Sequence, residues 1–168
     1  MTELGMVVGT EESLRADGVG LVAGPSAGPA TGPVFVRLSQ GFLLVPVGEE
    51  AWKVIGCALA EDLEVAVNLS RFLAVVLGAV GLRPDAPGPV AFLELSEYKQ
   101  SGVAAVDGTV VEAAVTDFDG SQWRTPEADW AFNRVLRRLG ARAGASADEC
   151  AALGLTQYLA SLGTALSG

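Results

Sequence analysis

The segment from Leu69 to Val80 limits what this chain can fold into more than any other part of the sequence. Its only polar side chains are Ser70 and Arg71, and the preceding Asn68 is a residue type that caps helices. These features predict a helix that runs to about Gly81. A helix that is apolar all round is normally buried all round, so we expect it to be sheltered by a layered fold or by a second chain.

Most of the other apolar runs predict strands of an antiparallel sheet. Residues 34–47 form two β-rich runs around a short turn that contains glycine, which is typical of a hairpin. Residues 103–115 form a second pair of runs around Asp107-Gly108, two residues that tolerate the positive φ angles of a tight turn. Residues 90–95 predict a buried strand.

The first half of the chain gives weaker patterns. We expect residues 1–17 to be loosely ordered, with a short apolar piece around residues 6–8 and two helical turns at residues 10–15. Residues 18–33 should form a Gly/Pro-rich loop after a short strand at 19–23. Apolar residues at helical spacing favour a helix over residues 49–59, although residues 52–55 would also fit a strand. The alternation in residues 63–67 predicts a strand.

Two helices are expected at the C-terminal end. Residues 125–139 begin with a Thr-Pro pair, which is typical of a helix start. Ser146 and Glu149 have the spacing of a capping box, and they precede apolar residues at helical spacing up to Leu166, with a break at Gly154. Together the elements predict a single α+β domain over residues 1–168. We expect an antiparallel sheet of five or six strands, one buried central helix and two C-terminal helices.

Charge and composition exclude several classes of function. The chain has 11 basic and 20 acidic residues, a formal charge of −9, which disfavours binding to nucleic acid or to anionic membranes. Histidine is absent, which removes the Ser-His-Asp and Cys-His catalytic triads and histidine-ligated zinc sites.

Cysteine usage and the N-terminus suggest a cytoplasmic protein. Cys57 and Cys150 are far apart in the sequence and lack metal or redox spacing, so we expect two buried thiols. The N-terminus lacks the basic and apolar pattern of a signal peptide. The longest apolar run, residues 72–82, is too short to cross a membrane.

Acidic residues provide weak candidates for a site. Asp117 and Asp119 resemble the start of a calcium loop, but the following glycine falls at the wrong position, so a polar turn is favoured. We therefore expect no metal or cofactor. A carboxylate pair for acid/base chemistry could come from Glu94, Glu97, Glu112, Asp117 and Asp119.

Basic and aromatic residues near the C-terminal helices are candidates for binding a partner. Arg134, Arg137 and Arg138 form a basic cluster that could bind carboxylates, although a solvated helix face explains it as well. Trp123 and Trp130 could anchor an interface or belong to the core.

Two functional hypotheses remain. The first is a non-catalytic protein-interaction module of the adaptor, chaperone-like or immunity type, which binds a protein partner and forms a homodimer. The second is a small-ligand binder or a carboxylate-dependent enzyme, with an acidic pocket near Asp117 and Asp119.

Overall fold

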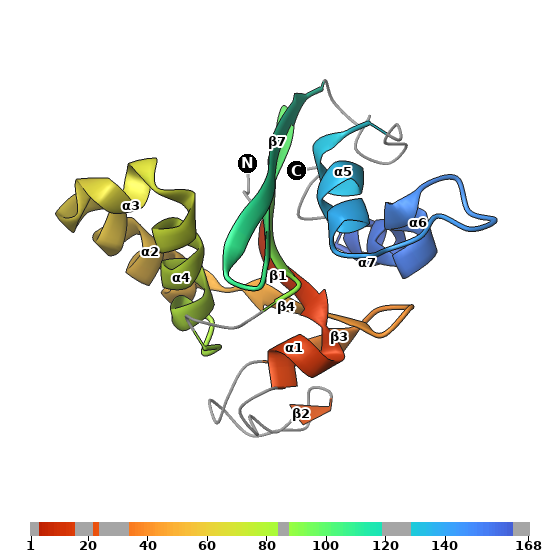
Figure 1. Cartoon of the computed structure of the whole chain (residues 1–168), viewed down its shortest axis with the longest axis horizontal. Helices are drawn as coiled ribbons and strands as arrows, with labels where there is room; N and C mark the ends of the chain where they lie inside the picture. Colours follow the sequence, from red (N-terminus) through yellow and green to blue (C-terminus); the bar gives the residue numbers. More distant parts are fainter. Residues whose placement is uncertain (1–3, 16–21, 24–33, 84–87, 119–128, 163–168) are drawn as a thin grey trace.

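A central antiparallel sheet lies between two groups of helices in the computed structural model (Figure 1). The structure describes residues 4–15, 22–23, 34–83, 88–118 and 129–162. In chain order the elements are β1 (Leu4–Thr10), α1 (Glu11–Arg15), β2 (Val22–Ala23), β3 (Val34–Arg37), β4 (Phe42–Val47), α2 (Glu49–Glu61), α3 (Leu63–Val67), α4 (Leu69–Ala79), β5 (Val90–Leu95), β6 (Lys99–Val106), β7 (Thr109–Asp117), α5 (Ala131–Arg138), α6 (Glu149–Leu153) and α7 (Leu155–Ser161).

The strand order is β2-β3-β4-β1-β5-β6-β7. Each neighbouring pair among the six strands β3, β4, β1, β5, β6 and β7 is antiparallel, and the two-residue β2 pairs parallel to β3. This confirms the predicted α+β class and the antiparallel sheet. The expectation of a loosely ordered N-terminus is wrong for residues 4–10, because β1 is a central strand whose side chains are buried on both faces of the sheet.

Both faces of the sheet are covered by helices. Met6 and Val8 belong to a core that includes α5, α6 and α7, whereas Val7 belongs to a second core that includes α2 and α4. Figure 1 shows the two helical groups on opposite sides of the strands. A strand buried on both faces needs apolar residues at consecutive positions, which explains runs such as Phe42–Val45.

Both predicted hairpins are confirmed. Gln40 and Gly41 connect β3 to β4 with φ angles of 62° and 77°, and Asp107 and Gly108 connect β6 to β7 with φ angles of 52° and 77°. Two successive residues with positive φ give the turn whose twist matches that of paired antiparallel strands. The second hairpin is longer than predicted, because β6 begins at Lys99.

The region before α4 departs from the prediction. The helix expected over residues 49–59 is confirmed as α2, but residues 63–67 form the short helix α3 instead of a strand. The side chain of Asp62 accepts a hydrogen bond from the backbone N–H of Glu64, and Asn68 donates its N–H to the carbonyl of Glu64. These bonds close a helical turn between two caps. An alternating pattern of only five residues favours a strand too weakly to prevent this.

Helix α4 is confirmed, together with its cap, and it is buried along only part of its surface. The side chain of Asn68 accepts hydrogen bonds from the N–H groups of Ser70 and Arg71. Leu73 and Val76 are buried, whereas Leu69 is 40% exposed. Within the described residues α4 packs on the sheet and against α2 and α3, and these elements do not shelter it on every side. Shelter by a second chain stays a prediction.

The C-terminal helices are confirmed, with different starting points. Helix α5 begins at Ala131, and the Thr-Pro pair predicted as the helix start lies outside the described residues. Asp148, and not Ser146, caps α6, because its side chain accepts from the N–H of Ala151. The predicted break at Gly154 is confirmed, since its φ angle of 87° separates α6 from α7. Leu166 lies outside the described residues, as do residues 18–21 and 24–33 of the predicted loop.

The start of α5 is capped by side chains from the sheet. The Oε1 atom of Gln100 on β6 accepts from the N–H of Phe132 at 2.7 Å, and the Oγ1 atom of Thr116 on β7 accepts from the N–H of Ala131 at 2.8 Å. The first turn of a helix has N–H groups without partners inside the helix. Here two strands satisfy two of them, which fixes where α5 lies on the sheet.

Replacing Gln100 by leucine should lower the free energy of unfolding by about 1–3 kcal/mol, because Gln100 is 1% exposed and its loss leaves a buried N–H without an acceptor. Chemical denaturation measures this difference. The matched control is Gln157→Leu, which changes an exposed glutamine on α7 and should have little effect. Equal stabilities of the two variants would contradict the capping role.

Candidate functional site

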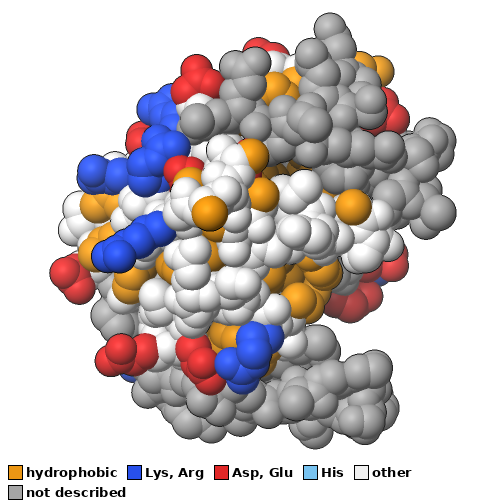
Figure 2. Space-filling model, turned by 90° about the vertical axis from the view of Figure 1, so that its right-hand side faces the viewer, with side chains coloured by type: hydrophobic (Ala, Val, Ile, Leu, Met, Phe, Trp, Pro, Cys, Tyr) orange, Lys and Arg blue, Asp and Glu red, His pale blue; other side chains and the backbone are white. Residues whose placement is uncertain are grey.

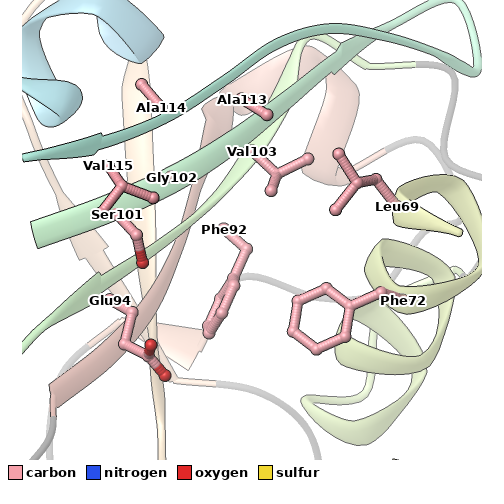
Figure 3. A pocket seen from close by; sticks show the side chains of 10 residues that line it. All are labelled: Leu69, Phe72, Phe92, Glu94, Ser101, Gly102, Val103, Ala113, Ala114 and Val115. Atoms are coloured by element: carbon pink, nitrogen blue, oxygen red, sulfur yellow. The ribbon is translucent and has the colours of Figure 1, made fainter. Parts of the chain in front are cut away.

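An apolar groove lies between α4 and the sheet, on the face opposite α5 (Figure 3). Its volume is about 270 Å³. Two residues of α4 form one wall, and residues of β5, β6 and β7 form the other wall and the floor. The lining residues are Leu69, Phe72, Phe92, Glu94, Ser101, Gly102, Val103, Ala113, Ala114 and Val115.

Aromatic side chains hold α4 and α2 against the sheet at this groove. Phe92 on β5 makes edge-to-face contacts with Phe72 on α4 and with Trp52 on α2, at ring-centre distances of 5.6 and 6.0 Å. Trp52 also packs onto Gly5 of β1, where a Cβ atom would lie 2.6 Å from the indole ring. Because Gly5 has no side chain, the rings of Trp52 and Phe92 can both approach this position of β1 closely.

Small side chains on β6 and β7 leave the groove open. Ser101 and Val103 on β6 lie opposite Val115 and Ala113 on β7, and all four project toward the α4 face of the sheet. Val115 is 64% exposed and Ala113 is also exposed. Together with Leu69 they present apolar surface to water, a feature that is typical of contact surfaces in folded domains.

Glu94 and Ser101 give the groove a polar end. They are neighbours across β5 and β6, and Figure 3 shows both side chains on the side of Phe92 away from Leu69. Glu94 is half-buried. The groove therefore combines an apolar body with a carboxylate and a hydroxyl at one end.

The predicted basic cluster lies on the other face, on α5. Arg134 pairs with Glu112 of β7 at 3.4 Å. Arg137 donates from Nε and Nη2 to the Glu149 carboxylate of α6 at 2.9 and 2.7 Å, and that carboxylate is nearly buried. Arg138 is exposed and has no ion pair with any residue that the structure describes. Two of the three arginines thus hold this chain's own elements together.

The margin of the α5–α7 side carries charges of both signs. Figure 2 shows that side, where Lys and Arg side chains lie at the upper left of the view with Asp and Glu side chains among them. Arg142 is exposed, and its backbone N–H and carbonyl bond to the side chain of Gln40 at 3.0 and 2.8 Å. This exchange ties the turn of the β3–β4 hairpin to the segment after α5.

The two predicted anchor tryptophans differ in outcome. Trp130 is half-buried and stacks on Phe118 with a ring-centre distance of 5.4 Å and an interplanar angle of 11°. It packs against the core under α5. Trp123 lies outside the described residues.

The predicted acidic candidates are not brought together. Asp117 is exposed at the end of β7 and does not line the groove, and Asp119 lies outside the described residues. Glu112 pairs with Arg134 on the opposite face. Within the described ranges no three Asp, Glu, Cys or His side chains form a group that could hold a metal ion. Glu97 is half-buried and does not line the groove.

Sequence reasoning missed the groove itself. Leu69 and Phe72 were assigned to a buried helix, and Val115 to a strand without a functional role. The available signal was the small size of Ser101 on β6 and Ala113 on β7. These two residues lie near each other only in one register of the strands, and the sequence does not give that register.

Comparisons with known proteins give no assignment. No family model matches this chain, and no curated protein and no solved structure is significantly similar to it. No helix among the described residues is long and apolar enough to span a membrane.

The two cysteines should differ in reactivity. Both are free thiols, but Cys57 on α2 is exposed, which corrects the expectation of two buried thiols. Burial raises the pKa of the Cys150 thiol well above its usual 9.0, and the charges of Asp148 and Glu149 raise it further.

We expect a thiol reagent at mildly alkaline pH to label one cysteine in the native protein and two after denaturation. Mass spectrometry counts the labels, and rapid native labelling of Cys150 would contradict its burial.

Proposed function

We propose that this protein is a non-catalytic protein-interaction module of the adaptor, chaperone-like or immunity type, and that it self-associates through the groove. The single observation that supports this most is apolar surface at the α4 wall and on β7, where Leu69 and Val115 are exposed to water. The groove is lined mainly by apolar side chains, so covering it removes apolar surface from water. A protein partner, in the first place a second copy, is the proposed occupant.

The chemical inventory is consistent with a role in binding. The whole chain lacks histidine, and among the described residues Glu112 pairs with Arg134 on the α5 face, whereas Glu94 lines the groove and Asp117 does not. A binding module needs no catalytic group. The free thiols are consistent with a reducing compartment, and we place this role in the cytoplasm as part of the proposal.

Replacing Leu69 by aspartate should weaken self-association about tenfold or more, because a charge then enters the apolar wall of the contact. Leu69 is the first residue of α4, where a carboxylate is favourable to the helix dipole, so the fold should persist. Sedimentation velocity over a wide range of concentration measures the change.

The matched control is Val54→Asp. It changes an apolar residue on α2 that is 52% exposed and does not line the groove, and it should leave association unchanged. A wild-type protein that stays monomeric at high micromolar concentration would refute self-association. Equal effects of the two substitutions would refute the groove as the contact.

The shape of the groove supports a second candidate function, binding of a small ligand. An apolar cavity with a few polar groups at one end is the usual form of a ligand site. Its polar end holds Glu94 and Ser101 and not the predicted Asp117, so the matching ligand is an apolar amine. The carboxylate-dependent enzyme that belongs to this alternative would use the same carboxylate.

If this alternative holds, aliphatic amines should raise the melting temperature of the wild-type protein and leave that of Glu94→Gln unchanged. A thermal-shift series with amines and the corresponding neutral alcohols measures the effect. Equal shifts with amines and alcohols, or in both proteins, would show that Glu94 does not select the ligand.

A further inference from the structure

Strand β7 is the last strand of the sheet in the part of the chain that the structure describes. Just after it, Phe118 donates its backbone N–H to the carbonyl of Tyr98 at 2.7 Å. Hydrogen-bonded pairs in an antiparallel ladder alternate with pairs whose backbone groups point away from the partner strand. Even-numbered residues at this end of β7 therefore bond to β6, and odd-numbered residues direct their N–H and C=O groups outward.

The outward-facing residues are Ala113, Val115 and Asp117. All three are exposed, and the side chains of Ala113 and Val115 line the groove. A row of outward N–H and C=O groups with apolar neighbours is a template for another strand. The backbone edge and the apolar groove thus belong to one continuous surface.

This edge has little of the protection that isolated edges carry. The ladder between β6 and β7 has an irregularity at Ala104 and Ala105, and from Glu112 to Asp117 it is regular. That regular stretch contains no proline and no lysine, the residues that commonly block strand addition. The edge is therefore open to a strand of matching sequence.

We propose that β7 pairs antiparallel with β7 of a second copy about a two-fold axis at Ala114, so that the two sheets join into one. This inference rests on the proposed self-association and specifies how it occurs. Residues opposite each other in such a pair lie on the same face of the sheet, so odd-numbered residues meet odd-numbered residues. The outward groups of Ala113 then bond to those of Val115 in the other copy.

The sequence of β7 is complementary to itself in this register. Ala113 of each copy lies opposite Val115 of the other copy, so the two exposed apolar side chains meet at two places. Glu112 lies opposite Thr116, so no carboxylate faces another within the pairs from Glu112 to Thr116. Cross-strand pairs of this kind stabilise a sheet, whereas like charges placed opposite each other destabilise it.

Local charge also favours a second copy as the occupant. Glu112 is already neutralised by Arg134 on its own chain, at 3.4 Å. Val115 of the second copy lies beside Ala113, which lines the same groove as Leu69. The joined strands thus extend the apolar wall of each groove, and this links the edge to the contact proposed above.

Hydrogen exchange on the wild-type protein tests this pairing. The N–H groups of Ala113 and Val115 should exchange about tenfold more slowly once the concentration of free chain is about ten times the dissociation constant. The N–H groups of Glu112, Ala114 and Thr116 bond to β6 in either state, so they serve as the internal control. Sedimentation velocity on the same samples reports the oligomeric state.

Val115→Lys provides the second arm, because a lysine on an edge strand disfavours strand addition. We expect it to weaken association at least about tenfold. Val54→Lys, the same change at an exposed valine on α2, should leave association unchanged.

The outcomes separate the two proposals. A dimer in which Ala113 and Val115 exchange freely, or in which Val115→Lys has no effect, overturns the β7 pairing and leaves self-association standing. A wild-type protein that remains monomeric overturns both.

Discussion

Burial of the central strands on both faces is the constraint on which this structure depends. Val7 and Val8 are adjacent in β1 and both are fully buried, yet they belong to different cores. Neighbouring strand residues point to opposite faces, so each face needs its own helical layer. The layered fold follows from this requirement and does not need α4 to be enclosed. Helix α4 can therefore keep one side in water without loss of the architecture.

The two helical layers cover the β6–β7 side of the sheet unequally, and that difference creates the candidate site. On one face, Gln100 and Thr116 cap the start of α5, and the side chain of Asn133 accepts a bond from the N–H of Cys150 in α6. These buried bonds hold α5 and α6 in one position. On the other face, α4 meets the strands through Phe72 and leaves Val115 exposed. The groove is the part of the sheet that this layer does not fill.

The sequence predicted what local chemistry decides. Asn68 as a cap, Asp107-Gly108 as a turn and Gly154 as a break all depend on residues close together in the chain. The errors arose where distant residues decide. Helix α5 starts at Ala131 because side chains from β6 and β7 satisfy its first N–H groups. The groove joins α4 to β7, and no local pattern gives the register between strands. The helical state of residues 63–67 was set by the caps at both ends of that segment.

Two copies of a chain with a formal charge of −9 repel each other, so self-association requires a contact where this repulsion is small. Repulsion between two acidic molecules is spread over their surfaces and is screened beyond about 10 Å at ordinary salt concentration. Backbone hydrogen bonds and apolar contacts act only where the two chains touch. A contact between two copies is therefore favourable where the charge is locally balanced. Residues 113–116 are uncharged and Glu112 is matched by Arg134, so the outer edge of β7 meets this condition despite the acidity of the whole chain.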